Sequence, residues 1–160
     1  MSYHATLVQY YEEEVEGEAY FAELAKRFED PAHREKLTLL AEVERHAAEA
    51  VAPLIEKYGL IPKQSEALVE SGRADAQSTA ADWDKLIAGM NATYTGYLND
   101  FKNLETMGPA EDQQRLTFLT EHEVAAIRFL DLEANDPAAS AAPLRAYLAA
   151  SPENWSPHAA

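Results

Sequence analysis

The sequence predicts an all-α protein, a four-helix bundle with one long connection in its middle and a short helix near its C-terminus. Apolar residues recur at alternating spacings of three and four over four long segments, which is the periodicity of an amphipathic helix. Glycine, proline and aspartate separate these segments, and no stretch shows the alternation of a half-buried strand. With 160 residues, the chain is long enough for one domain with its own core.

The first two predicted helices cover residues 3–28 and 32–58. The apolar rows of the first contain Leu7, Tyr11, Glu14, Glu18, Phe21, Ala25 and Phe28. Those of the second contain Leu37, Leu40, Glu44, Ala47, Val51, Leu54 and Tyr58. Asp30-Pro31 separates the two helices, because the residue before a proline disfavours the α conformation. Gly59 is a natural stop for the second helix.

A long polar connection, LIPKQSEALVESGRADAQST, follows at residues 60–79, and we expect only one short helical turn in it, near residues 66–70. The third helix is predicted at residues 80–107 and the fourth at 109–134, with Gly108-Pro109 between them. The third carries an apolar row of Trp83, Ile87, Met90, Tyr94, Tyr97, Phe101 and Leu104. The bundle then occupies residues 1–137, and the tail 138–160 packs on it within a single domain, with a short helix near 144–150.

The lengths of the connections favour one topology. Short, long and short joins between four long helices fit two antiparallel hairpins linked by a single crossover between helices two and three. A simple up-down-up-down bundle with a loose middle loop is the alternative, because loop length alone does not fix the direction of a helix.

Charge and composition limit the partners. The formal net charge of −15 opposes binding to nucleic acid and to anionic membranes. The chain has no cysteine, its first residues lack the pattern of a signal peptide, and no apolar run is as long as a membrane span. We therefore expect a soluble cytoplasmic protein with no disulfide, which could form a homodimer or a larger homo-oligomer.

Four glutamates interrupt the apolar rows: Glu14, Glu18, Glu44 and Glu123. The last of these lies in FLTEHEVAAIRFL, where the helical rows run through Leu116, Leu119, Glu123, Ile127 and Leu130. An ionised carboxylate at a buried position costs several kcal/mol without a partner, and no lysine or arginine shares these rows. A metal cation, shared protons, tyrosine hydroxyls or simple exposure to water could each resolve this cost.

Three stretches resemble a known family. YYEEEVEGEAYFAELA, LLAEVERHAAEAV and FLTEHEVAAIRFLDLE are similar to helices one, two and four of rubrerythrin and bacterioferritin relatives in the ferritin-like superfamily, over most of residues 7–132. In that superfamily two helices each give a carboxylate and two others each give Glu-x-x-His to a di-iron site. By position, Glu18 or Glu14 matches the first carboxylate, and Glu44 and Glu123 match the motif glutamates. The resemblance implies iron acting on oxygen or peroxide.

The sequence departs from the family motif at three positions. Ala47 and Ala126 stand three residues after Glu44 and Glu123, where the family has histidine. Met90 stands in the third helix, where the family has another glutamate. The di-iron motif is therefore incomplete.

Two histidines lie near the motif but in a different frame. On an ideal helix, His46 lies roughly 200° around from Glu44, and His122 roughly 100° around from Glu123. We interpret both as residues at the edge of a helix, with a role as nitrogen ligand as the alternative.

These observations predict a ferritin-like protein with a degenerate carboxylate site that binds metal weakly or not at all. One alternative is an iron-binding protein or iron-dependent oxidoreductase, with Glu18, Glu44 and Glu123 as carboxylate ligands. Another is a scaffold that binds a small molecule or another protein. In that case a pocket opens where the family has ligands, and its candidate residues are Met90, Tyr94, Tyr97, Ala47 and Ala126.

Overall fold

The computed structural model of the chain describes residues 1–156, and over this range it confirms the all-α class. The described residues form six α-helices and three short 3-10 helices, with no β-strand. The α-helices are α1 (Tyr3–Ala25), α2 (Pro31–Lys57), α3 (Ser65–Ser78), α4 (Trp83–Met107), α5 (Gln113–Asn135) and α6 (Ala142–Ala149). The 3-10 helices are η1 (Ala110–Asp112), η2 (Pro137–Ala139) and η3 (Pro152–Asn154). The last residues of the predicted tail, 157–160, lie outside the described range.

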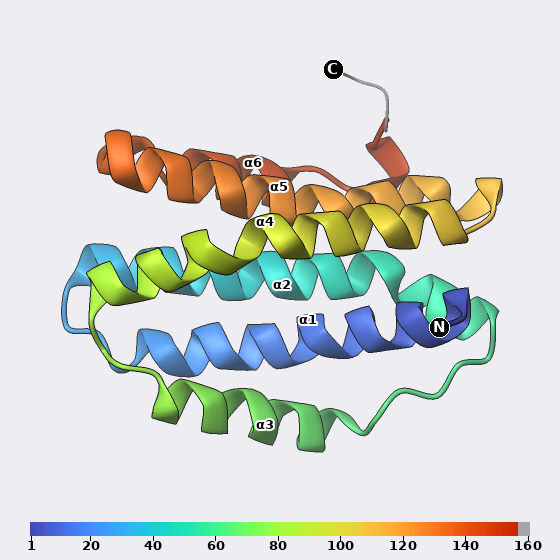
Figure 1. The fold of residues 1–160 in the computed structure, drawn as a ribbon, viewed down its shortest axis with the longest axis horizontal. Coiled ribbons are helices and arrows are strands. Elements are labelled where there is room, and N and C mark those ends of the chain that lie inside the picture. Colours follow the sequence, from blue (N-terminus) through green and yellow to red (C-terminus); the bar gives the residue numbers. More distant parts are fainter. Residues whose placement is uncertain (157–160) are drawn as a thin grey trace.

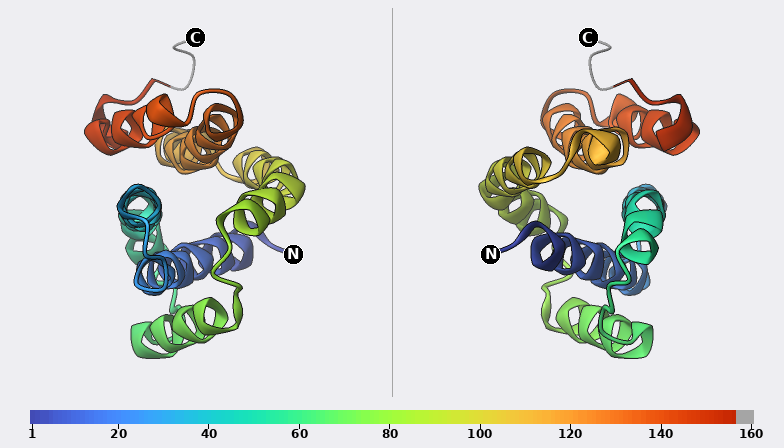
Figure 2. Two further views of the ribbon diagram at one scale, coloured as in Figure 1. Left: turned by 90° about the vertical axis from the view of Figure 1, so that its left-hand side faces the viewer. Right: turned by 90° about the vertical axis from the view of Figure 1, so that its right-hand side faces the viewer.

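Four long helices surround a common core. In Figure 1, α1 and α2 form one antiparallel hairpin and α4 and α5 form another, and α2 and α4 run in the same direction because α3 carries the chain back between them. The end views in Figure 2 show α1, α2, α5 and α4 around the centre, with α3 outside α1 and α6 beside α5. The core is continuous from α1 to α6, where Leu144 and Tyr147 are buried in it.

Helix boundaries follow local capping chemistry. The side chains of Ser2, Asp30 and Asp82 accept hydrogen bonds from backbone N–H groups in the first turns of α1, α2 and α4, at 3.1, 2.8 and 3.1 Å. Gly59 follows α2 with φ +60°, a conformation that costs glycine little. The first helix ends at Ala25 and not at residue 28. The N–H groups of residues 26–28 bond to carbonyls three residues back, which is the pattern of a 3-10 turn.

The prediction of a single helical turn near residues 66–70 is wrong. Helix α3 has 14 residues and packs along the outer face of α1, with Leu68, Gly72 and Ala76 buried at spacings of four. A Cβ at Gly72 would lie 2.3 Å from the backbone oxygen of Glu16, so the backbones of α3 and α1 approach closely there. Only one large apolar side chain marks the buried face, which is why the apolar periodicity was too weak to predict this helix.

We expect Gly72→Ala to destabilise the protein by about 1–3 kcal/mol, because the added methyl group forces α3 away from α1. The matched control is Gly96→Ala on α4, where an added Cβ meets no atom within 4 Å. Removal of a mid-helix glycine there should instead stabilise the protein by up to about 1 kcal/mol. Urea unfolding of the three proteins measures both changes, and a Gly72→Ala protein as stable as the parent would contradict the packing described for α3.

Among residues 1–156, no helix combines the length and the apolar character that a membrane crossing requires.

Helix α4 is the most exposed of the four long helices, and Tyr97, predicted in its apolar row, is 49% exposed. Its buried residues are Leu86, Met90, Phe101 and Leu104.

Candidate metal centre

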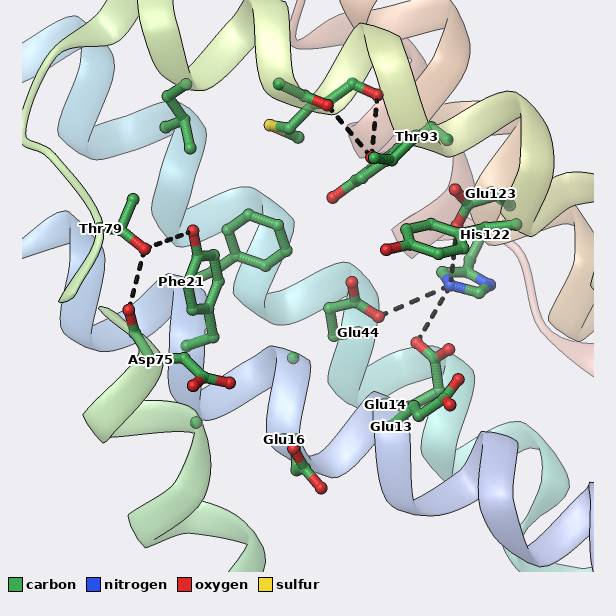
Figure 3. A pocket seen from close by; sticks show the side chains of 18 of the residues that line it. Glu13, Glu14, Glu16, Phe21, Glu44, Asp75, Thr79, Thr93, His122 and Glu123 are labelled. Carbon is green, nitrogen blue, oxygen red and sulfur yellow. Dashed lines mark hydrogen bonds and ion pairs between the residues drawn. The ribbon is translucent and has the colours of Figure 1, made fainter. Parts of the chain in front are cut away.

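Four polar side chains from three helices meet inside the bundle. Glu14 comes from α1, Glu44 from α2, and the neighbours His122 and Glu123 from α5; we call these four residues the carboxylate–histidine cluster. The Nε2 atom of His122 lies 3.0 Å from Oε2 of Glu14, and 3.5 Å from an Oε2 atom of Glu44 and of Glu123. Figure 3 shows Glu14 and Glu44 pointing toward the ring of His122, with Glu123 beside it.

Helix α5 supplies two neighbouring residues because it is covered on several sides. It packs against α4, α2 and α6, so residues about 100° apart on this helix both face protein. His122 is 2% exposed and Glu123 is 4% exposed. A helix in this position has a buried surface wider than a single apolar row. The interpretation of His122 as a helix-edge residue is therefore wrong.

The backbone fixes the orientation of the His122 ring. The Nδ1 atom is hydrogen-bonded to the carbonyl oxygen of Leu119, one turn earlier in α5. With the proton on Nδ1, the other nitrogen directs a lone pair at the three carboxyl groups. A lone pair facing carboxylate oxygens is repulsive, so this arrangement requires either a proton between Nε2 and a carboxyl oxygen or a metal cation among the four side chains.

Burial makes ionisation of the three glutamates unfavourable. The pKa of Glu14 is raised to about 8, mainly by burial. A hydrogen bond to Glu44 opposes this rise, and the charge of the nearby Glu123 adds to it. Burial, followed by the charge of Glu14, holds the pKa of Glu44 well above its usual range. Burial also raises the pKa of Glu123 to about 7, against the opposing effect of His122. Without a cation, the cluster holds protons near neutral pH.

The cluster has fewer donors than the other buried carboxyl groups of the chain. Asp112 accepts hydrogen bonds from Tyr3, Tyr58 and Lys57 at 2.7, 2.5 and 2.7 Å. Glu133 accepts from the side chains of a lysine and a tryptophan at 2.7 and 3.0 Å. By contrast, Oε2 of Glu14 and Oε1 of Glu123 are buried and have no hydrogen-bond donor among residues 1–156.

The spacing of the donor atoms fits a metal ion. Ligand bonds of about 2.1 Å put neighbouring ligand atoms about 3.0 Å apart around an octahedral ion and about 3.4 Å apart around a tetrahedral one. The three contacts of His122 Nε2 fall between 3.0 and 3.5 Å. Glu14, Glu44 and His122 each offer a ligand atom within 4.8 Å of the others. One imidazole and two carboxylates therefore have the spacing of ligands to a single divalent transition-metal ion, with the unpaired Oε2 of Glu14 among the donor atoms. Glu123, whose Oε2 lies 3.5 Å from the same nitrogen, is the nearest further carboxylate of the cluster.

Gly17 leaves room for the carboxyl group of Glu44. It lies one turn after Glu14 on α1, and a Cβ there would come within 3.0 Å of the Glu44 carboxyl carbon. A larger side chain would compete with Glu44 for this position. Nothing in the apolar periodicity of the sequence pointed to Gly17.

Two of the predicted ligands lie away from the cluster. The carboxylate of Glu18 is 36% exposed and lies 4.0 Å from the guanidinium of Arg45, because one further turn along α1 moves it to the surface. The Nε2 atom of His46 is hydrogen-bonded to the carbonyl oxygen of Ala150 at 2.7 Å, and its ring packs against Phe118 and Tyr147. His46 therefore joins α2 to the C-terminal segment, and neither Glu18 nor His46 contributes an atom to the cluster.

A cavity of about 580 Å³ opens from the cluster between α1, α3 and α4. Of the predicted pocket residues, Met90, Tyr94 and Tyr97 line it. Ala47 and Ala126 do not; both are buried in the packed interior. The substitution of family ligands by small residues is therefore not what creates this cavity, which lies where α4 stands away from α1.

Comparison with known proteins gave no matching family model, no similar curated protein and no similar solved structure.

Proposed function

We propose that this chain is a ferritin-like metal-binding protein whose carboxylate–histidine cluster holds one divalent transition-metal ion. The observation that carries this proposal is the convergence of two buried carboxyl groups and one partly buried one on the Nε2 atom of His122, with two buried oxygens that have no donor among residues 1–156. A cation at the centre of these atoms would remove their mutual repulsion and satisfy both oxygens.

Two further observations support the ferritin-like part of the proposal. The chain has two antiparallel helix hairpins with a long crossover, and α2 and α4 run in the same direction (Figure 1). Glu44 and Glu123, which match the motif glutamates of that superfamily, both belong to the cluster.

The donor set favours one ion over two. Helix α4 contributes Met90 to the cavity and no carboxylate to the cluster, and the cluster has a single histidine. A combination of imidazole and carboxylate oxygens without thiolate suits Fe(II) or Mn(II), and the resemblance to iron proteins favours Fe(II). A bound Fe(II) ion would supply Lewis acidity and one-electron redox chemistry at the inner end of the cavity.

The residues of the chain have defined roles toward such an ion. Glu14, Glu44 and Glu123 would provide oxygen donors and His122 the nitrogen donor. The carbonyl of Leu119 holds the imidazole in the tautomer that presents Nε2.

Elemental analysis tests the proposal directly. Protein produced with iron and manganese supplied, and purified without chelators, should carry about one transition-metal ion per chain. We expect the double variant Glu14→Gln/Glu123→Gln to lose this ion, because amide groups replace two carboxylate ligands. The matched control is Glu18→Gln, on the same helix as Glu14 but outside the cluster, which should retain it. Absence of metal from the parent protein, or full retention in the double variant, would contradict the proposal.

A further inference from the structure

The cavity that opens from the cluster has a wall rich in aromatic residues. Tyr20 and Phe21 contribute from α1, and Met90, Tyr94 and Phe101 from α4. Its volume of about 580 Å³ lies within the range of sites that hold drug-sized organic molecules. The metal ion proposed above occupies only the inner end, so the rest of this space is large enough for an organic ligand.

The charged residues that line the cavity are mostly acidic. Besides the three glutamates of the cluster, the acidic residues Glu13, Glu16, Asp75 and Asp100 line the cavity. Among the described lining residues, Lys85 is the one lysine or arginine. A divalent ion in the cluster would leave the cavity negative, since four further carboxylates remain around it. Carboxylates around a concave, partly apolar site concentrate cations and repel anions.

The inner end also has polar atoms that lack partners. Glu14 and Glu123 both line the cavity, are at least nine-tenths buried, and each has one oxygen without a hydrogen-bond donor among residues 1–156. Tyrosine faces add a second attraction for organic cations, because the negative face of an aromatic ring attracts an ammonium group.

We propose that this cavity binds a small organic cation, an amine with an apolar or aromatic body. The body packs against the wall formed by Phe21, Met90 and Tyr94, and the ammonium group lies among the carboxylates. This inference goes beyond metal binding and rests on the size of the cavity and the charge of its lining. In metal-free protein the unpartnered oxygens of Glu14 and Glu123 are available to the ammonium group, and with an ion in the cluster the four further carboxylates of the lining remain.

Three indole compounds of similar shape but different charge test the proposal. Tryptamine, tryptophol and indole-3-acetate carry an ammonium, a hydroxyl and a carboxylate group on nearly the same body. We expect isothermal titration calorimetry with the full chain at pH 7 to show tryptamine binding at least tenfold more tightly than indole-3-acetate. Tryptophol should be intermediate, and the affinity for tryptamine should fall as salt is raised. Equal affinities for the three compounds, or no binding of tryptamine, would overturn the proposal.

Variants at two glycines of α4 test where the ligand binds. An added Cβ meets no atom within 4 Å at either Gly89 or Gly96, but only Gly89 lines the cavity. Gly89→Leu should therefore occupy cavity space and weaken tryptamine binding at least tenfold, while Gly96→Leu should bind as the parent does. Equal binding by the two variants would place the ligand elsewhere and overturn the proposal.

Titration of chelator-treated and metal-supplied protein separates this inference from the proposed metal site. Preference for tryptamine in protein that takes up no metal would contradict the metal proposal alone. Uptake of metal without any preference for tryptamine would contradict the cavity proposal alone.

Discussion

Replacement of His122 by alanine is expected to lower the affinity for Fe(II) or Mn(II) by about a hundredfold or more. Removal of a group that only orients a metal ligand typically costs ten- to a hundredfold, and His122 is the sole nitrogen donor of the cluster. Its Nε2 atom also lies within 3.5 Å of all three glutamates, so its loss removes the atom on which they converge. Competition with a coloured chelator measures the affinity of the variant and of the parent.

The matched control for this variant is His46→Ala. The ring of His46 packs against Phe118 and Tyr147, but its Nε2 atom bonds to the carbonyl oxygen of Ala150 and not to the cluster. We expect this variant to lose some stability by loosening the C-terminal segment while keeping the metal affinity of the parent. Equal loss of affinity in the two variants would indicate that the effect comes from general loosening of the fold.

The metal-free protein is expected to become less stable as pH rises from 6 to 8. The raised pKa values of about 8 for Glu14 and about 7 for Glu123 mean that these groups bind more protons folded than unfolded. Their contribution to stability is complete below the unfolded pKa of about 4.5 and is lost as pH rises through the folded values. We expect the melting temperature of chelator-treated protein to fall on the order of 5 °C over this interval.

Glu123→Gln isolates the cluster from the titration of the rest of the chain. Glutamine needs no proton at pH 8, so in metal-free protein the variant should melt above the parent at pH 8 and close to it at pH 5. With metal supplied the sign reverses, because the variant lacks a ligand and acid displaces the ion from the parent. Glu18 lies beside Arg45 with its side chain 36% exposed, so Glu18→Gln should change neither profile. A constant difference between Glu123→Gln and parent from pH 5 to 8 would show that Glu123 does not titrate in this interval.

Apolar periodicity predicted the long helices and three of the four cluster residues, since Glu14, Glu44 and Glu123 stood out as acidic residues in apolar rows. It did not separate Glu14 from Glu18, because both occupy the same row of α1. Which of them is buried depends on where α4 and α5 cover that row. Tertiary packing decides which glutamate is buried, and the pattern of a single sequence does not reveal that packing.

The other errors have related causes. His122 was assigned to a helix edge because the prediction assumed one buried row per helix, whereas α5 is enclosed by α2, α4 and α6. Helix α3 was missed because it packs through Gly72 and Ala76, residues too small to produce a strong apolar pattern. The cavity depends on how far α4 stands from α1, a distance that no local pattern encodes.

The most direct test of the central claim is a crystal structure of protein supplied with Fe(II) or Mn(II), with anomalous diffraction recorded at the absorption edge of the metal. We predict one anomalous peak per chain, about 2.0–2.3 Å from Nε2 of His122 and from oxygen atoms of Glu14, Glu44 and Glu123. No peak at this position in metal-supplied crystals, or a peak bound by other residues, would contradict the claim that these four side chains form a metal site.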